Sequence, residues 1–501
     1  MRPADAPRGK PRSQAMATGA GRSRCSEGVV AERQRRVAPL AATSPAEAGE
    51  EPFLRGIFEI SKRSCDVVLS ARRLRWSPIL PESPTGDSSM LLQAPEEIIE
   101  MKDVFSVKLK RRRFVGQKKG GMLLGITIFK CLNKEENKLT DCAIHLHNLS
   151  EDHCHSWFKH LKEILNGFQN RPKSLKVFVN PRSHKREATH IYYEQVSPLF
   201  KLAGIKTDVT ITEYEGHALS VLKDCELQAF DGVVCVGGDG SVSEVAHGLL
   251  LKAQIDAGKD TDYIPKPVKA PVPLGVIPAG TTNILAHTLY GVKHAVTATL
   301  HIVMGQRNVK YHLYQYKFHR ETIMRMTGSK NQWHKTQGHF LNVSIMAIPC
   351  LCSMAPRGLA PNTRLCCCIV CGHSWSSCSV ARELLNNGSM ALILVQNTSR
   401  TEFIKHLKRY TSERNQFNFP FVETYTVQEV KVQPRLGSGL DAKENKCMNA
   451  ASAERHHPWN IDGDLLKEAS EVHVRVHPQL INLYGVNTDD LERSQATCNC
   501  I

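Results

Sequence analysis

Short runs in which apolar and polar residues alternate fill the chain from about residue 53 to residue 168. The clearest runs are at residues 54–60, 65–69 and 122–129. Alternation with a period of two places successive side chains on opposite faces of a strand, so these runs predict a small antiparallel sheet. From about residue 151 to 167 the spacing becomes helical, and one apolar face contains Trp157, Phe158, Leu161, Ile164 and Leu165. We therefore expect a sheet closed by one amphipathic helix.

Strands and helices alternate in the next part of the chain. Apolar runs that predict buried strands lie at residues 175–179, 208–212, 232–236 and 274–277, and helical patterns lie at about 188–203, 217–228 and 242–253. This alternation predicts a parallel sheet with helices on both faces. Beyond residue 305 the signal is poorer, and the strands expected at 340–347, 389–395, 424–432 and 472–476 indicate a second, β-rich domain.

Residues 1–51 are rich in Arg, Ala, Pro, Gly and Ser and have few aromatic residues. Such a segment buries too little apolar surface to fold, so we expect a disordered basic tail; an Arg-rich transit peptide is the alternative. The predicted division is a tail at 1–51, a sheet-and-helix domain at 52–169, an α/β domain at 170–305, a β-rich domain at 306–486 and a tail at 487–501.

The charge balance favours anionic partners. The 501 residues include 65 Lys and Arg against 49 Asp and Glu, a formal charge of +16. This balance attracts phospholipid head groups, nucleotide phosphates or nucleic acid, although no interleaving of aromatic and basic residues favours nucleic acid. The sequence predicts neither a spanning helix nor a secretory signal. The 17 cysteines are dilute, so we expect mostly reduced thiols in the cytosol or nucleus.

A basic cluster lies within the first domain. Its members are Lys108, Lys110, Arg111, Arg112 and Arg113. Clustered Lys and Arg predict a loop that binds phosphoinositide head groups, or a nuclear-import signal. The alternative is a solvated strand edge.

A glycine-rich motif follows the strand expected at 232–236. It contains Gly237, Gly238, Asp239, Gly240 and Ser241. Glycines let the backbone approach a phosphate closely, and the N-terminus of the following helix favours anions. Ser241 and Glu244 have the spacing of a capping box, which would start that helix. We expect a phosphate site here; a tight turn without a ligand is the alternative.

A second motif follows the strand expected at 274–277. Gly280, Thr281 and Thr282 lie at the carboxyl end of this strand, where open α/β sheets bind ligands. Their backbone and hydroxyl groups suit a nucleotide phosphate or ribose. The alternative is a simple turn that caps a helix starting near Ile284.

Together, these motifs resemble the catalytic domain of the diacylglycerol, sphingosine and ceramide kinases. The shared features are Gly-Gly-Asp-Gly before a helix, Pro-Ala-Gly-Thr after the next strand, and the pairs Asn180-Pro181, Thr212-Glu213 and His217-Ala218. The N-terminal strands and their Trp-bearing helix resemble a pleckstrin-homology (PH) domain, which narrows the resemblance to the ceramide-kinase branch. Further similar segments are residues 355–359, 417–423 and 459–464.

The resemblance implies an α/β plus β fold. It comprises a PH-like N-terminal domain, a diacylglycerol-kinase-type α/β catalytic domain and a C-terminal β-sandwich, with nucleotide bound between the last two. Asp239 would be a catalytic base or a metal-linked carboxylate. The implied nucleotide-binding residues are Asn180, Gly237, Gly238, Gly240, Ser241, Glu244, Gly280, Thr281, Thr282 and Asp462.

The resemblance also implies partners and a location. ATP and Mg²⁺ would be the cofactors, and ceramide, other sphingolipids or phosphoinositides would be the lipid partners. We expect a protein of the cytoplasm and nucleus that associates peripherally with internal membranes, the endoplasmic reticulum and Golgi. Its implied role is in lipid-linked signalling or cell survival under stress.

Three departures from the family pattern weaken the expectation of catalysis. Residues 182–186, Arg-Ser-His-Lys-Arg, replace a glycine-rich loop; Asn283 replaces an aspartate; and residues 306–339 lack the family's glycine-rich strand and lipid-site acid. We therefore expect an incomplete sandwich and a non-catalytic or very weakly active protein. The alternative is an active ATP- and Mg²⁺-dependent kinase that phosphorylates a hydroxyl of ceramide, another sphingolipid or diacylglycerol.

A cysteine-rich stretch at 366–383 is additional to the family pattern. Cys371, His373 and Cys378, with Cys350 and Cys352, offer zinc ligands, but their spacing fits no standard finger, so we expect an inserted loop and assign no metal site. Cys498 formally fits a prenylation box; a variant tail is the interpretation we prefer.

Overall fold

The computed structural model describes residues 53–79, 96–112, 115, 120–135, 137–183, 186–261, 267–306, 309–318, 325–327, 333–347, 355, 359, 388–412, 415–434, 459–461, 464–466 and 471–485. The tails expected at 1–51 and 487–501 lie outside these residues. None of the described helices is long and apolar enough to cross a bilayer.

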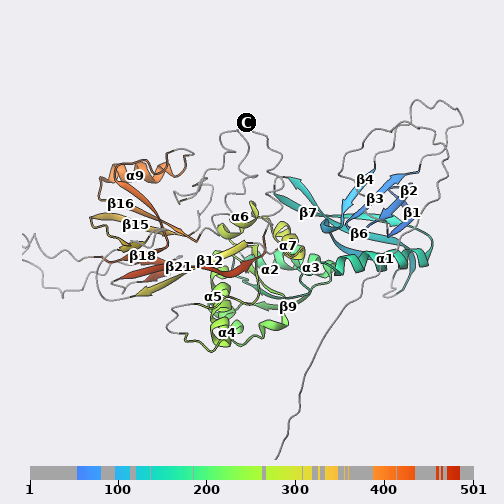
Figure 1. The fold of residues 1–501 in the computed structure, drawn as a ribbon, viewed down its shortest axis with the longest axis horizontal. Coiled ribbons are helices and arrows are strands. Elements are labelled where there is room, and N and C mark those ends of the chain that lie inside the picture. The colour runs from blue at the N-terminus through green and yellow to red at the C-terminus, as the bar shows by residue number, and fades with distance from the viewer. Residues whose placement is uncertain are drawn as a thin grey trace, which may run out of the picture. The chain divides into compact units, whose positions relative to one another are not determined.

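The N-terminal region is an antiparallel sheet with one helix against it (Figure 1). Its strands are β1 (Leu54–Ile60), β2 (Arg63–Leu69), β3 (Arg73–Pro78), β4 (Glu97–Glu100), β5 (Val104–Arg112), β6 (Met122–Glu135) and β7 (Lys138–His147), in the spatial order β4-β3-β2-β1-β7-β6-β5. Helix α1 (Glu151–Asn166) begins where Ser150 Oγ accepts a hydrogen bond from His153 N, and it buries Trp157 and Leu161 in the core of this region. The expected sheet closed by an amphipathic helix is confirmed.

A parallel sheet follows, built from β8 (Ser174–Val179), β9 (Lys206–Ile211), β10 (Gly232–Gly237) and β11 (Leu274–Pro278). Their order in space is β9-β8-β10-β11, so the chain turns back after β9. Because crossover connections are right-handed, α3 (Ser197–Ala203) lies on one face, and α4 (His217–Asp224) with α5 (Asp239–Asp256) lies on the other. Helix α2 (Ala188–Ile191) continues through a π turn into α3, and α6 (Ile284–Tyr290) and α7 (Ala295–Val303) follow β11.

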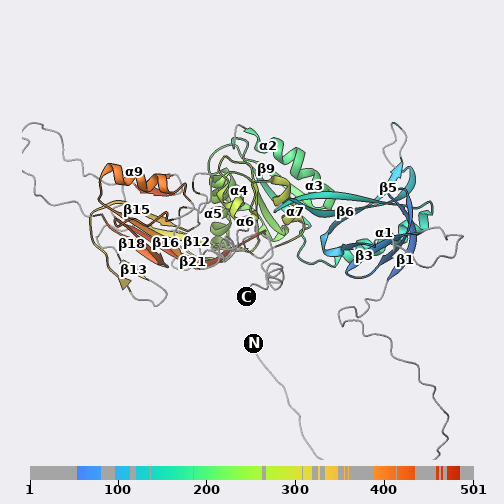
Figure 2. The same ribbon diagram turned by 90° about the horizontal axis from the view of Figure 1, so that it is seen from above.

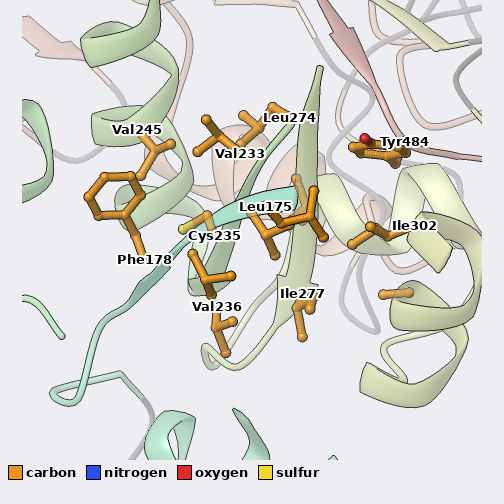
Figure 3. Close-up of a cluster of buried hydrophobic side chains, with 14 of the residues drawn as sticks. Leu175, Phe178, Val233, Cys235, Val236, Val245, Leu274, Ile277, Ile302 and Tyr484 are labelled. Atoms are coloured by element: carbon orange, nitrogen blue, oxygen red, sulfur yellow. The ribbon is translucent and has the colours of Figure 1, made fainter. Parts of the chain in front are cut away.

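Strand β10 runs through the centre of the largest core, shown in Figure 3, and all of its residues are buried. Val245 of α5 and Ile302 of α7 pack in the same cluster. A strand covered on both faces carries a continuous apolar run, which made it recognisable in the sequence. Burial raises the pKa of the Cys235 thiol, so this group stays protonated and unreactive. Among the described residues, free thiols stand at 65, 131, 142, 154, 225 and 235.

The long strand β21 (Val472–Leu483) joins the α/β sheet to the C-terminal region. Its Leu483 pairs with Leu274 of β11, whereas its first residues pair with β18 (Glu429–Val432). It also pairs with β12 (Val309–Phe318). Two short strands, β13 (Arg325–Thr327) and β14 (Trp333–His334), extend the sheet beyond β18. One sheet therefore continues across the boundary expected at residue 305.

Strand β12 occupies residues 309–318, for which the sequence predicted no strand, although it lacks the glycine-rich pattern of the family. Apolar residues stand at 309, 311 and 313 and then at 314, 316 and 318, so the alternation changes phase within the run. The pairing with β21 is irregular between Tyr311 and Leu313. An irregularity of this kind shifts which residues face each side of a sheet. The sequence pattern therefore did not identify a single ten-residue strand.

A three-stranded sheet packs on β18 and β21 to form a sandwich. Its strands are β15 (Phe340–Met346), β16 (Met390–Gln396) and β17 (Val422–Val427), and the shared core contains Met390, Leu392, Leu394, Val427, Val430, Val432, Val472 and Val474. The single strand expected at 424–432 is wrong, because the chain leaves one sheet and enters the other at Gln428. Helix α9 (Arg400–Arg409) follows β16, and β19 (Trp459–Ile461) with β20 (Asp464–Leu466) forms a small hairpin.

The N-terminal sheet and the α/β domain are packed together (Figure 2). Phe105 of β5 belongs to the core of the α/β domain. Beside it, Ser106 Oγ donates a hydrogen bond to Leu202 O at 2.5 Å. Leu139 N of β7 donates to Thr297 Oγ1 of α7 at 3.0 Å. These contacts predict that the two regions stabilise each other.

Replacing Phe105 with Ala is expected to lower the free energy of unfolding by about 3 kcal/mol, because the lost ring leaves a cavity in the shared core. Amide hydrogen exchange in α3 and α7 should become faster in the same variant. The control, Phe53→Ala, removes a ring that is 56% exposed and should cost less than about 0.5 kcal/mol. Unchanged exchange in α3 and α7 would mean that the two regions unfold independently.

Acid is expected to destabilise the C-terminal region through His406. This imidazole is buried among Tyr410, Phe419 and Phe421, and burial lowers its pKa below the ordinary 6.5. The unfolded chain therefore binds a proton that the folded chain does not, so stability falls as the pH drops through the ordinary pKa towards the lowered one.

The thermal unfolding midpoint should accordingly decline between about pH 7 and pH 5. We expect the decline to be shallower in His406→Phe, which cannot titrate, and unchanged in the control His190→Phe, whose imidazole is exposed. An equal slope in the wild type and His406→Phe would contradict this assignment.

Candidate functional site

The candidate site lies at the carboxyl ends of the parallel strands. Asn180 follows β8, Gly238 follows β10 and Gly280 follows β11. Strands β8 and β10 are neighbours whose connections leave to opposite faces, and such a switch point is where open α/β sheets bind ligands. The structure therefore brings both glycine motifs to one edge of the sheet, which we call the switch-point edge.

Helix α5 begins earlier than the sequence predicted. Its first residue is Asp239, and its N-cap is Gly238, with no side-chain cap. The expected capping box is wrong, because both of its side chains have partners elsewhere. Ser241 Oγ accepts a hydrogen bond from Asn180 Nδ2 at 2.8 Å, and Glu244 Oε1 accepts one from Ala218 N at 2.8 Å. Glu244 thus caps α4, and the N-terminus of α5 has no capping side chain.

The two glycine motifs touch through their backbones. A Cβ atom on Gly280 would lie 2.3 Å from Gly238 Cα, a separation that real side chains do not reach. A Cβ on Gly237 would lie 2.8 Å from Ser241 Oγ. At Gly240, by contrast, a Cβ would meet nothing within 4 Å. Glycine is thus required by packing at 237 and 280, whereas Gly240 leaves open space beside the start of α5.

The carboxylate of Asp239 joins the turn after β10 to the helix after β11. Its Oδ2 accepts hydrogen bonds from Thr282 Oγ1 at 2.9 Å and from Ile284 N at 3.0 Å, and its Oδ1 accepts one from Leu285 N at 3.1 Å. The negative charge therefore lies at the N-terminus of α6. A carboxylate has about four lone-pair positions, and these bonds leave one on Oδ1.

The side chain of Asn283 forms two hydrogen bonds with the backbone of Gly280, within the second motif. The backbone of Asn283 is left-handed, with φ of 50°, a conformation that Asn tolerates better than most residues. Its Oδ1 accepts from Gly280 N at 2.8 Å, and its Nδ2 donates to Gly280 O at 2.7 Å. An aspartate could make only the first of these bonds, because an ionised carboxylate has no donor. The asparagine therefore fixes the turn more completely than an aspartate would.

The electrostatics of the edge favour an anion. The uncapped N-terminus of α5 carries the positive end of an 18-residue helix. Arg182 is exposed in the adjoining turn, where its backbone N–H donates to Asn180 Oδ1. Ser183 Oγ lies 3.5 Å from the position of a Cβ on Gly237. Together, these groups make the environment of the glycine turn polar and positively charged.

The structure describes some, but not all, of the other residues predicted to form binding sites. Thr281 and Thr282 are exposed at the edge. Lys108, Lys110, Arg111 and Arg112 lie on β5. The residues that fall outside the described part are Arg113, Asp462, Cys498 and the possible zinc ligands Cys350, Cys352, Cys371, His373 and Cys378.

Sequence reasoning missed an aromatic pair at the same edge. Tyr214, after β9, is 55% exposed and stacks on His217, with ring centroids 4.7 Å apart and planes 14° apart. His217 Nδ1 accepts a hydrogen bond from Glu213 N at 3.0 Å, which fixes the orientation of its ring. The sequence signal that could have identified this pair was Tyr214, an aromatic residue in a glycine-containing loop after a predicted strand.

Comparisons with known proteins agree with this arrangement. Family profiles match in the order ceramide kinase PH domain at residues 54–161, diacylglycerol kinase catalytic domain at 174–315 and ceramide kinase C-terminal domain at 308–501. The ceramide kinase-like protein of Homo sapiens is 51% identical, over 89% of this chain and 92% of the relative.

Two ceramide kinases are more distant. That of Mus musculus is 27% identical over 88% of this chain and 98% of its own length, and that of Homo sapiens is 29% identical over 67% and 78%. The chain thus has the PH, catalytic and C-terminal regions in one polypeptide, and it belongs to the family of ceramide kinases and ceramide kinase-like proteins.

Proposed function

We propose that the chain binds Mg²⁺-ATP at the switch-point edge and transfers its phosphate to lipid very slowly or not at all. The observation that carries the proposal is the uncapped N-terminus of α5 beside the Gly238–Gly280 backbone contact. Backbone N–H groups at a helix start bind phosphate well when no side chain intervenes. Because the Asp239 carboxylate is bound at α6, it does not cap the N-terminus of α5.

Binding of a nucleotide, rather than of phosphate alone, is supported by Tyr214. Its exposed ring lies at the end of β9, two strands from β10, and strands are spaced about 4.8 Å apart. The distance of about 10 Å between these strand ends is comparable with the extent of a nucleotide from base to phosphates. Arg182 supplies a further cation for the phosphates.

The residues present fit Mg²⁺ as a companion of the nucleotide. Protein sites usually hold Mg²⁺ through one or two carboxylates together with the phosphates of the substrate. Asp239 Oδ1 keeps one lone-pair position and would hold the ion, which when bound would neutralise charge on the phosphates. Asn283 would supply no carboxylate.

The same geometry supports the proposal that catalysis is weak or absent. Asp239 accepts three hydrogen bonds in the fold, so taking a proton from a lipid hydroxyl would compete with its support of α6. Proton transfer by a positioned base is worth about a hundredfold or more in rate. We therefore propose that the site has kept its phosphate-binding architecture and has lost most of its ability to activate an acceptor.

The PH region supports a role at lipid surfaces. Three of the cations on β5, Lys108, Lys110 and Arg112, alternate along the strand and therefore share one face. We propose peripheral association with internal membranes of the endoplasmic reticulum and Golgi, in a protein of the cytoplasm and nucleus. Ceramide, another sphingolipid or a phosphoinositide would be the lipid partner, in signalling or survival under stress.

Calorimetry should detect binding of Mg²⁺-ATP to the full chain. Gly238→Val is expected to abolish it, because even a Cβ at this position would lie 3.3 Å from Gly280 Cα and larger branches would fill the anion site. Ser243→Ala, at an exposed position of α5, is the matched control and should bind as the wild type does. No ATP binding by folded wild-type protein would refute the proposal.

Phosphate transfer should be at least about a hundredfold slower than with human ceramide kinase measured in parallel. The assay uses labelled ATP with ceramide, sphingosine and diacylglycerol in turn. Rapid transfer that Asp239→Asn abolishes, in a variant with unchanged thermal stability, would overturn the proposal and establish the active lipid kinase.

A further inference from the structure

A row of cations faces a pair of histidines across the outer surface of the PH sheet. On β5 the row is Lys108, Lys110 and Arg112, and on β7 the histidines are His145 and His147. The strand register aligns Lys108 with Thr127 and His145, and it aligns Lys110 with Gly125 and His147. We call the three cations and two histidines the lysine–histidine face.

Gly125 makes the closest contact on this face possible. It lies between Lys110 and His147 in the register and has no side chain to separate them. Lys110 Nζ approaches His147 Nε2 to 3.4 Å. A lysine donates to an imidazole nitrogen only when that nitrogen is unprotonated, since two cations at this distance repel each other. The contact therefore brings the positive charge of Lys110 directly beside the two histidines.

The other histidine of the face, His145, lies beside this contact. His145 Nδ1 lies 2.9 Å from Thr127 Oγ1, and its ring is 6.2 Å from that of His147. Burial, then Lys110 and His147, lower the pKa of His145. Burial, then Lys162 of α1, lowers the pKa of Lys108. In the absence of an anion, this face resists further positive charge.

The surrounding charges are mixed. Glu59 of β1 lies opposite His147 in the strand register. Together with Lys62, Glu97 and both histidines, it lines a shallow depression of about 290 Å³. Strand β6 contributes Thr127 and Gly125 to the aligned rows, neither of which is ionisable. The cations on and around the face outnumber these two carboxylates, and protonation of His145 would increase the excess of positive charge.

We propose that the lysine–histidine face docks on a bilayer that carries anionic lipid phosphates, and that docking takes up a proton at His145. The proposal rests on the peripheral membrane role proposed above. Lipid phosphates placed over the face would offset the positive charge of Lys110, so His145 beside it could also become a cation. The two equilibria are linked: if docking raises the affinity of the histidine for a proton, then a lower pH raises the affinity of the face for the bilayer by the same factor.

Exposed apolar side chains beside the face favour a bilayer over a soluble phosphate. Met122 pairs with Arg112 in the register and is 58% exposed. Leu149, two residues after His147, is 95% exposed. Surfaces that combine such apolar groups with Lys and Arg bind the interfacial region of anionic membranes. A soluble inositol phosphate would gain nothing from these two residues.

The test measures binding of the full chain to vesicles of phosphatidylcholine with and without phosphatidylserine. Affinity for the anionic vesicles should rise about tenfold between about pH 7.5 and pH 5.5, as expected when a histidine takes up a proton on binding. His145→Gln with His147→Gln should remove the rise. The matched control is His160→Gln, whose partly exposed imidazole on α1 donates to Ser156 O, and it should keep the rise.

Each contrary outcome overturns a different statement. Binding that is equally tight at both pH values, or a rise that survives in the double variant, rejects proton uptake and leaves the peripheral role standing. No binding to anionic vesicles at either pH rejects both. Inositol hexakisphosphate serves as the soluble arm; if it binds with the same pH dependence while the vesicles do not, the face is a site for soluble anions and not for a bilayer. Circular dichroism checks the folding of each variant.

Discussion

The carboxylate of Asp239 holds the candidate site together. It stands at the first position of α5, yet its hydrogen bonds go to the first backbone N–H groups of α6 and to the hydroxyl of Thr282. One side chain thus fixes the turn after β10 against the turn after β11. Since those turns touch through Gly238 and Gly280, a change in either would move both. The uncapped start of α5 depends on the same arrangement, because the carboxylate that could have occupied it is held elsewhere.

Asn283 shows how an edge of this kind can keep its shape while its chemistry changes. Its amide satisfies both the N–H and the carbonyl of Gly280, which a carboxylate cannot do. The substitution therefore removes a possible metal ligand and at the same time stabilises the turn that presents Thr281 and Thr282. Under the proposed function, an edge that only binds phosphate would not need a carboxylate at this position.

The sequence predicted those features that depend on local periodicity. The continuous apolar run of β10 and the helical spacing of α1 each identify their element from neighbouring residues alone. The capping box failed because Ser241 and Glu244 take partners 61 and 26 residues away, Asn180 and Ala218. Likewise β12 and the division at Gln428 depend on pairing with β21, which lies far along the chain. Tertiary hydrogen bonds decided these outcomes, and no local pattern records them.

Strand β7 connects the two proposed functions physically. Near its start, Leu139 exchanges hydrogen bonds with Thr297 of α7, and near its end it presents His145 and His147. With a rise of about 3.3 Å per residue, about 26 Å of paired strand separates the two contacts. Strand β7 is paired with β6 along this length and with β1 at His147, so it does not bend freely. Because α7 packs against β11, and Gly280 follows that strand, the strand that presents the lysine–histidine face is connected through α7 to the strand that ends at the switch-point edge.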